Sequence, residues 1–173
     1  MKRADRKINA RMIAEIGLMA AILEVSKIAL SMIPNVELVS LEIILFTLYL
    51  GPWSLAAVWV FVGVECLVWG LSLWTVTYVY VWPILVVITL LMKHKENKPG
   101  EVWTFSIVSG LYGLFFGMLC AIPFLFVGGW KSAFGMWISG IPYDLIHCIG
   151  NFIICLILYK PLHTVLNHIR KMY

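Results

Sequence analysis

Three polar side chains interrupt a strongly apolar stretch near the end of the chain, at residues 140–161. Asp144, His147 and Asn151 follow one another at intervals of three and four. On a helix they share, with two cysteines, a stripe about 100° wide, and apolar residues fill the opposite side. Polar groups inside a membrane helix are costly unless they face a cavity or a partner. The pattern therefore predicts a helix whose polar face binds a ligand. The alternative is that the three residues pair with one another or with Glu65 and leave no cavity.

The composition is that of an integral membrane protein. Of the 173 residues, 62% are hydrophobic and only 13% are charged, whereas a soluble domain has roughly 25% charged residues. We expect one membrane domain, residues 1–173, that is all-α and folds as a helix bundle.

The chain divides into six apolar stretches, at residues 11–33, 38–50, 53–70, 76–92, 102–127 and 136–159. Eleven of the 13 Lys and Arg lie in the N-terminal segment, between the fourth and fifth stretches, or in the C-terminal tail. The positive-inside rule then places both termini in the cytoplasm. The expected fold is a six-transmembrane-helix bundle. The second stretch, with 13 residues, spans only about 20 Å of a core about 30 Å thick, so it begins earlier or crosses only partly.

Charged residues inside these stretches need a reason, because each costs roughly 2.5–3.5 kcal/mol on insertion scales. Glu24 and Lys27 are three positions apart, which suits a local ion pair or a contact to a ligand or partner subunit. Glu65 has no Lys or Arg near it in the sequence. It therefore requires a cavity or a partner on another helix.

Two further residues lie at the break between the first and second stretches. Asn35 and Glu37 could cap the helix that follows, because a side-chain acceptor and a negative charge both suit a helix N-terminus. Contact with a ligand is the alternative, and the sequence does not decide between them.

Aromatic residues crowd the expected outer half of the bundle. Trp74, Tyr78 and Trp82 recur at every fourth position and form a ladder on which a planar ligand could stack. Trp130 belongs to the loop before the last stretch. The alternative for each of them is the aromatic belt at the membrane interface.

The first stretch also carries small residues on one face. Ala14, Gly17 and Ala21 allow another helix to approach closely. That helix belongs either to the same bundle or to another membrane subunit.

Some kinds of chemistry have no support in the sequence. It contains neither a GxxxxGK[ST] loop for ATP nor an HExxH zinc motif. The four cysteines lie in apolar stretches without a CxxC pair, as expected of free thiols. We expect a protein that is not an enzyme and that has no cofactor and no metal site.

The six stretches, the small-residue face, the IPNVEL break at residues 33–38 and the ending GIPYDLIHCIGNFIICLILYKPL resemble a known family. This family is the S component, the substrate-binding subunit, of energy-coupling factor vitamin transporters. The resemblance covers nearly the whole chain. It implies a multi-pass protein of the prokaryotic plasma membrane that captures a vitamin or related micronutrient outside the cell with high affinity. It also implies docking on a transmembrane coupling subunit bound to two ATPases, and toppling in the membrane to release the substrate.

The resemblance also implies roles for individual residues. The docking motif maps to Ala14, Gly17 and Ala21, although the family usually has alanine where Gly17 stands. Binding residues of the family come from the outer loops and from helices 4–6. Together with the residues at the break and in the third stretch, the expected site is Asn35, Glu37, Glu65, Trp74, Tyr78, Trp82, Trp130, Asp144, His147 and Asn151.

The expected outer face is acidic, with Glu37, Glu65 and Asp144 against Lys131. This favours a neutral or cationic ligand, such as a thiamine-, riboflavin- or cobalamin-like molecule. Two other functions stay open. One is a structural or assembly protein of the membrane, and the other is a self-contained secondary carrier that uses Glu65 and Asp144 as proton sites.

Overall fold

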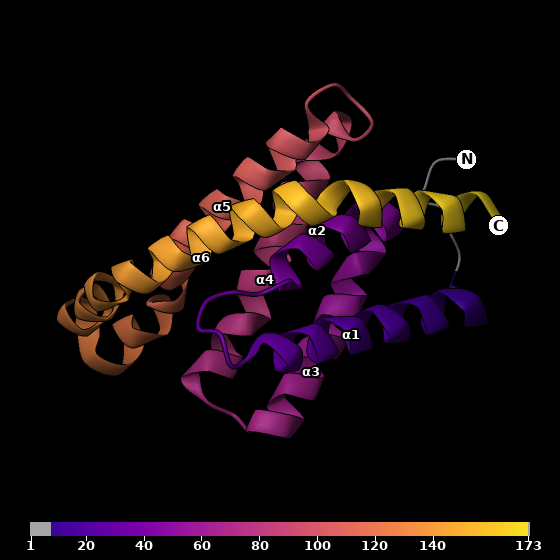
Figure 1. Ribbon diagram of the computed structural model, residues 1–173. Coiled ribbons are helices and arrows are strands. Elements are labelled where there is room, and N and C mark those ends of the chain that lie inside the picture. Colours follow the sequence, from indigo (N-terminus) through magenta and orange to yellow (C-terminus); the bar gives the residue numbers. More distant parts are fainter. Residues whose placement is uncertain (1–7, 173) are drawn as a thin grey trace.

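A computed structural model describes residues 8–172 of the chain, and no β-strand occurs among them (Figure 1). The predicted all-helical class is therefore confirmed. The basic residues Lys2, Arg3, Arg6 and Lys7, which contribute to the predicted topology, lie outside the described residues.

The described part of the chain contains α-helices separated by short connections. They are α1 (Ala10–Leu30), α2 (Val39–Leu50), α3 (Ser54–Trp69), α4 (Leu73–Met92), α5 (Glu101–Cys120) and α6 (Ile122–Met172), with short 3-10 turns η2 (Gly51–Trp53) and η3 (Lys93–Lys95). Gly129 interrupts α6 with a φ of 70°, a left-handed conformation that glycine adopts without strain. A short helix and a long one therefore meet at this kink.

Within residues 8–172, four helical segments are long and apolar enough to cross a membrane. They are Val39–Trp69, Leu73–Lys95, Glu101–Cys120 and Ile122–Met172. The predicted second and third stretches thus belong to one segment of 31 residues, bent at η2. Helix α1 is not among the four, and it carries Arg11, Glu15, Glu24 and Lys27 along its length. The membrane character is supported, whereas the count of six crossings stays a prediction.

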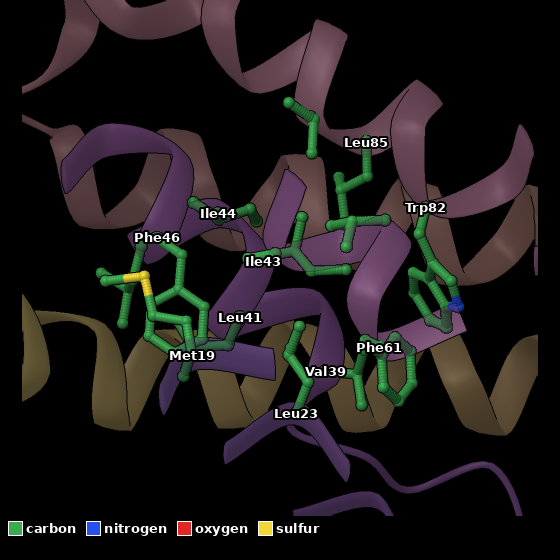
Figure 2. Packing of buried hydrophobic residues seen from close by; sticks show 14 of the residues in the cluster. Met19, Leu23, Val39, Leu41, Ile43, Ile44, Phe46, Phe61, Trp82 and Leu85 are labelled. Carbon is green, nitrogen blue, oxygen red and sulfur yellow. The ribbon is translucent and has the colours of Figure 1, made fainter. Parts of the chain in front are cut away.

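Helix α2 lies at the centre of the molecule. All of its residues, Val39 to Leu50, are buried, and Figure 2 shows Leu41, Ile43 and Ile44 of this helix among side chains of the core. Leu23 of α1, Phe61 of α3 and Leu85 of α4 belong to the same cluster. A helix enclosed by protein need not match the thickness of the lipid core, which explains how this short stretch is accommodated.

Helices α5 and α6 run side by side at very short range (Figure 1). Glycines on α5 make this approach possible. A Cβ atom built on Gly110 would lie 3.1 Å from Cβ of Phe152, and one on Gly113 would lie 2.8 Å from the carbonyl oxygen of His147. The backbone of α5 therefore fixes the position of the α6 segment that carries the polar stripe.

The outer faces of the helices are apolar. Large hydrophobic side chains exposed there include Ile13, Trp59, Leu67, Ile107, Leu111, Ile149 and Ile157. In water such a surface would aggregate, whereas it suits contact with lipid or with another membrane subunit.

The glycine contact gives a first prediction. In Gly113→Ala the new methyl group meets the His147 carbonyl, so the two helices must separate. Overpacking of this kind costs about 1–3 kcal/mol, and it outweighs the gain of up to about 1 kcal/mol from alanine's helix propensity. Thermal unfolding in detergent should show a lower Tm. The matched control is Gly63→Ala, because a Cβ there meets nothing within 4 Å. An unchanged Tm for Gly113→Ala would show that the helices are not so closely packed.

Candidate functional site

A cavity of about 460 Å³ lies beneath the connection between α1 and α2. The connection itself contributes residues from Ser31 to Glu37, and the walls come from α1, α3, α4, α5 and α6. Pockets for small organic ligands typically measure about 300–1,000 Å³. The cavity is thus large enough for a molecule of vitamin size.

Aromatic rings form most of one wall. Tyr78 and Trp82 have ring centroids 5.4 Å apart at an angle of 64°, and Trp82 and Phe116 have centroids 5.4 Å apart. Trp69 and Trp74 also line the cavity, and more than half of each side chain is exposed. The predicted ladder on α4 therefore borders the cavity with all three of its rings, although only Tyr78 and Trp82 are turned into the bundle. In Figure 2 Trp82 lies beside Phe61 at one side of the core.

Glu37 joins three parts of the structure at the cavity wall. Its Oε2 accepts a hydrogen bond from the backbone N–H of Ser40 at 2.8 Å, and its Oε1 accepts one from the Ser40 hydroxyl. His147 of α6 donates from Nε2 to the same Oε1 at 3.2 Å. Asn151, one turn further on, donates from Nδ2 to Oγ of Ser40 at 3.1 Å. Glu37 thus accepts hydrogen bonds from the first turn of α2 and also borders the cavity. Its contact with a ligand stays a prediction.

The same contacts set the charge of Glu37. Burial raises the pKa of its carboxyl group, but the hydrogen bonds from His147 and Ser40 lower it by more. The pKa therefore lies below its ordinary value, and the group is an anion at neutral pH.

Lys27 and Glu65 form an ion pair across α1 and α3 at the cavity. Only 2% of the Glu65 side chain is exposed, against 28% of the Lys27 side chain. The Lys27 ammonium also lies 5.7 Å from the ring centroid of Trp69 and 5.1 Å from that of Tyr78, within the range of a cation–π interaction. Glu65 thus has a partner on another helix, and Lys27 forms its salt bridge there rather than with Glu24.

Two buried polar atoms at the cavity have no hydrogen-bond partner among the described residues. They are Nε1 of Trp82 and Oε1 of Glu65. Buried polar groups are normally satisfied. A ligand that accepts from the indole and donates to the carboxylate would satisfy both.

The other predicted site residues have different environments. Asn35 lines the cavity. Asp144 is buried outside it, and its Oδ1 accepts a hydrogen bond from Gly117 N at 3.0 Å. Asn151 is buried behind Ser40 and supports Glu37 indirectly. Trp130 is 73% exposed and stacks on Phe134, outside the cavity. Of the polar stripe on α6, only His147 therefore reaches the cavity.

The expected site leaves out eleven of the 18 residues that line the cavity. Three of these eleven contribute a charge or an aromatic ring, namely Lys27, Trp69 and Phe116. Lys27 lies one turn before the end of α1, and Trp69 is the last residue of α3. Both helices end near the connection that covers the cavity. This position in the sequence could have indicated that Lys27 and Trp69 line the cavity. Phe116 lies in an ordinary apolar run, and nothing in its spacing sets it apart.

The small residues of α1 lie outside the cavity, nearer the start of that helix. Ala14, Gly17 and Ala21 are exposed, and a Cβ on Gly17 would meet nothing within 4 Å. A shallow groove of about 270 Å³ runs between this face and α3, with Gly17, Ala21 and Glu24 in its lining. This face is free to pack against another helix.

Among residues 8–172, no group of three His, Cys, Asp or Glu side chains could hold a metal ion. All four cysteines are free thiols. What the cavity offers chemically is burial, stacking and a few charged or hydrogen-bonding groups.

No family model, no curated protein and no solved structure matches the chain.

The Glu37 cluster gives a second prediction. Because the folded pKa is lowered, the ionised carboxylate stabilises the fold above the unfolded pKa, and this contribution is lost as the pH falls through the folded value. The Tm of the wild type should therefore exceed that of Glu37→Gln at pH 7. The difference should shrink between about pH 5 and pH 3. Parallel melting curves over this range would contradict the assignment of the charge to Glu37.

Proposed function

We propose that this chain is the S component, the substrate-binding subunit, of an importer of the energy-coupling factor type. In this role it captures a vitamin or related micronutrient outside the cell, and a transmembrane coupling subunit with two ATPases completes the transport. The observation that carries the proposal is the cavity of about 460 Å³, with its aromatic wall and its few polar groups. A cavity of this kind has a clear use in a binding subunit and none in a purely structural membrane protein.

The residues of the wall suggest how a ligand is held. A planar ring would stack against Tyr78 and Trp82, because aromatic faces supply large apolar area with a preferred geometry. The indole N–H of Trp82 and the carboxylate of Glu65 would fix its orientation. The connection that contains Glu37 covers the cavity and would exclude water from the bound ligand.

The charges at the cavity suggest the kind of ligand. Glu37 and Glu65 face it with two negative charges, and Lys27 contributes one positive charge. Among these three side chains the acidic groups therefore outnumber the basic one. This supports a neutral or cationic ligand over an acid.

The proposed topology has six crossings, with α1 included and both termini in the cytoplasm. The start of α1 and the end of α6 lie at the same end of the molecule (Figure 1), and Arg170 and Lys171 lie in the last turn of α6. With this end in the cytoplasm, the cavity at the other end of α1 would open outward. This arrangement suits capture of a substrate from outside a prokaryotic cell.

The exposed small residues of α1 support a docking role. Ala14, Gly17 and Ala21 would allow a helix of the coupling subunit to approach closely. The sequence has no P-loop, so in this proposal the ATPases supply the energy.

The proposal is tested by a thermal-shift screen of the purified protein against B vitamins and their precursors. A ligand at 100 times its Kd stabilises the native state by about 2.7 kcal/mol, so one compound should raise the Tm clearly. Trp82→Ala should abolish the shift. The matched control is Trp130→Ala, an indole outside the cavity, which should retain it. A compound whose shift survives Trp82→Ala but is lost in Trp130→Ala would place the site elsewhere.

A further inference from the structure

Lys27 occupies a place at the cavity that suits a ligand cation. Its ammonium contacts the buried carboxylate of Glu65 and lies 5.1 Å and 5.7 Å from the ring centroids of Tyr78 and Trp69. Carboxylates and aromatic faces are the groups that recognise organic cations. We refer to Glu65, Trp69 and Tyr78 as the cation cage.

We propose that Lys27 is a tethered competitor for the cation cage, and that the ligand carries a positively charged planar ring that takes its place. This inference rests on the proposed function and narrows its substrate class from neutral or cationic to cationic.

The two partners of the ion pair differ in a way that favours exchange. Glu65 is held inside the bundle, whereas more than a quarter of the Lys27 side chain is exposed. A lysine ammonium sits on a flexible four-carbon stem, so it can leave without moving the backbone. A buried carboxylate without a counter-charge is strongly unfavourable. Whatever displaces Lys27 must therefore bring a positive charge of its own.

The displaced lysine has a second carboxylate within reach. Glu24 lies three positions before Lys27 on the same helix, a spacing at which side chains meet. Lys27 attracts its carboxylate, whereas Glu65 repels it. Both of its carboxylate oxygens are buried beside Glu65. Lys27 can therefore move from Glu65 to Glu24 and keep an ion pair.

This exchange also links the cavity to the groove between α1 and α3. Glu24 lines the shallow groove beside Gly17 and Ala21, whereas Lys27 lines the ligand cavity. When the ligand enters the cation cage, the charge of Lys27 would be transferred toward the groove side of the helix. Occupancy of the cavity would thus change the electrostatics of the face that is free to dock.

The opposite reading is that Lys27 is the counter-charge for an acidic ligand. It makes the opposite prediction for a neutral substitution. Lys27→Met removes the competitor in our proposal and should tighten the binding of a cation. If Lys27 is instead the counter-charge of an acidic ligand, Lys27→Met removes that contact and should abolish the binding of an anion.

The experiment uses three probes that share one ring and differ in charge. They are 1-methylnicotinamide (a cation), nicotinamide (neutral) and nicotinate (an anion). Binding to the full-length detergent-purified protein is measured by isothermal titration at fixed ionic strength. Because a tethered group acts at millimolar effective concentration, Lys27→Met should bind the cation about tenfold more tightly than the wild type. Nicotinamide and nicotinate should gain nothing.

Three further variants separate this effect from changes in folding. Lys27→Gln, which keeps a polar side chain, should reproduce the result of Lys27→Met if that variant is unstable. The double variant Lys27→Met with Glu65→Gln should lose the gain, because the cation cage has lost its charge. Glu24→Gln should weaken cation binding to the wild type, because the displaced lysine loses its second partner. The matched control is Glu15→Gln, a carboxylate on the same helix that pairs with Arg11, which should leave cation binding unchanged.

Each outcome decides the question. Equal or absent binding of the cation by the wild type and by folded Lys27→Met or Lys27→Gln protein overturns the proposal. Binding of nicotinate by the wild type that is lost in Lys27→Met also overturns it. The proposed transport function is tested by a different outcome. A neutral or acidic vitamin that raises the Tm in a Trp82-dependent manner would leave that function intact and remove only the cation cage.

Discussion

The fold above the cavity depends on one partly buried carboxylate. Glu37 is anchored by Ser40 at the start of α2 and by His147 on α6, and Asn151 supports Ser40 from the next turn. Its neighbours in sequence form the cover of the cavity. Opening this chain segment would separate the Glu37 carboxylate from its hydrogen-bond partners on α2 and α6. The cover, the central helix and the polar face of α6 therefore behave as one unit.

The remaining walls follow from how the helices pack around α2. Glycines on α5 let α6 approach until backbone meets backbone, which brings His147 to the cavity. On the other side, Lys27 and Glu65 join α1 to α3 at the level where both helices end. The aromatic residues of α4 lie between these two polar pairs. The result is an apolar, stacking interior with charge at its two edges, an arrangement suited to recognising a small ring with a polar or charged substituent.

The sequence predicted the helical membrane class and seven of the 18 residues that line the cavity, because both follow from local rules. Ionisable residues in apolar stretches are costly, so Glu65 and His147 were conspicuous, and the period of the aromatic residues identified Tyr78 and Trp82. The remaining differences depend on contacts between helices, about which a sequence pattern gives no information. Asp144 accepts a hydrogen bond from the backbone N–H of Gly117 on α5. The spacing of Lys27 suited a local ion pair with Glu24 or a contact to a ligand or partner subunit, and the structure pairs it with Glu65 of α3. The length of the second stretch indicated an earlier start or a partial crossing. The structure encloses its helix in the bundle, and the extent of its crossing stays a prediction.

The most direct test of this account is native mass spectrometry of the protein released from membranes of bacterial cells grown in a vitamin-rich medium. The account predicts a species heavier than the bare chain by one small molecule, with one molecule per chain. Fragmentation of that adduct should identify a positively charged heteroaromatic compound, and Trp82→Ala protein should lack it. A wild-type chain that carries no small molecule, and that gains none after incubation with the same vitamins, would contradict the central claim that this cavity is a ligand site.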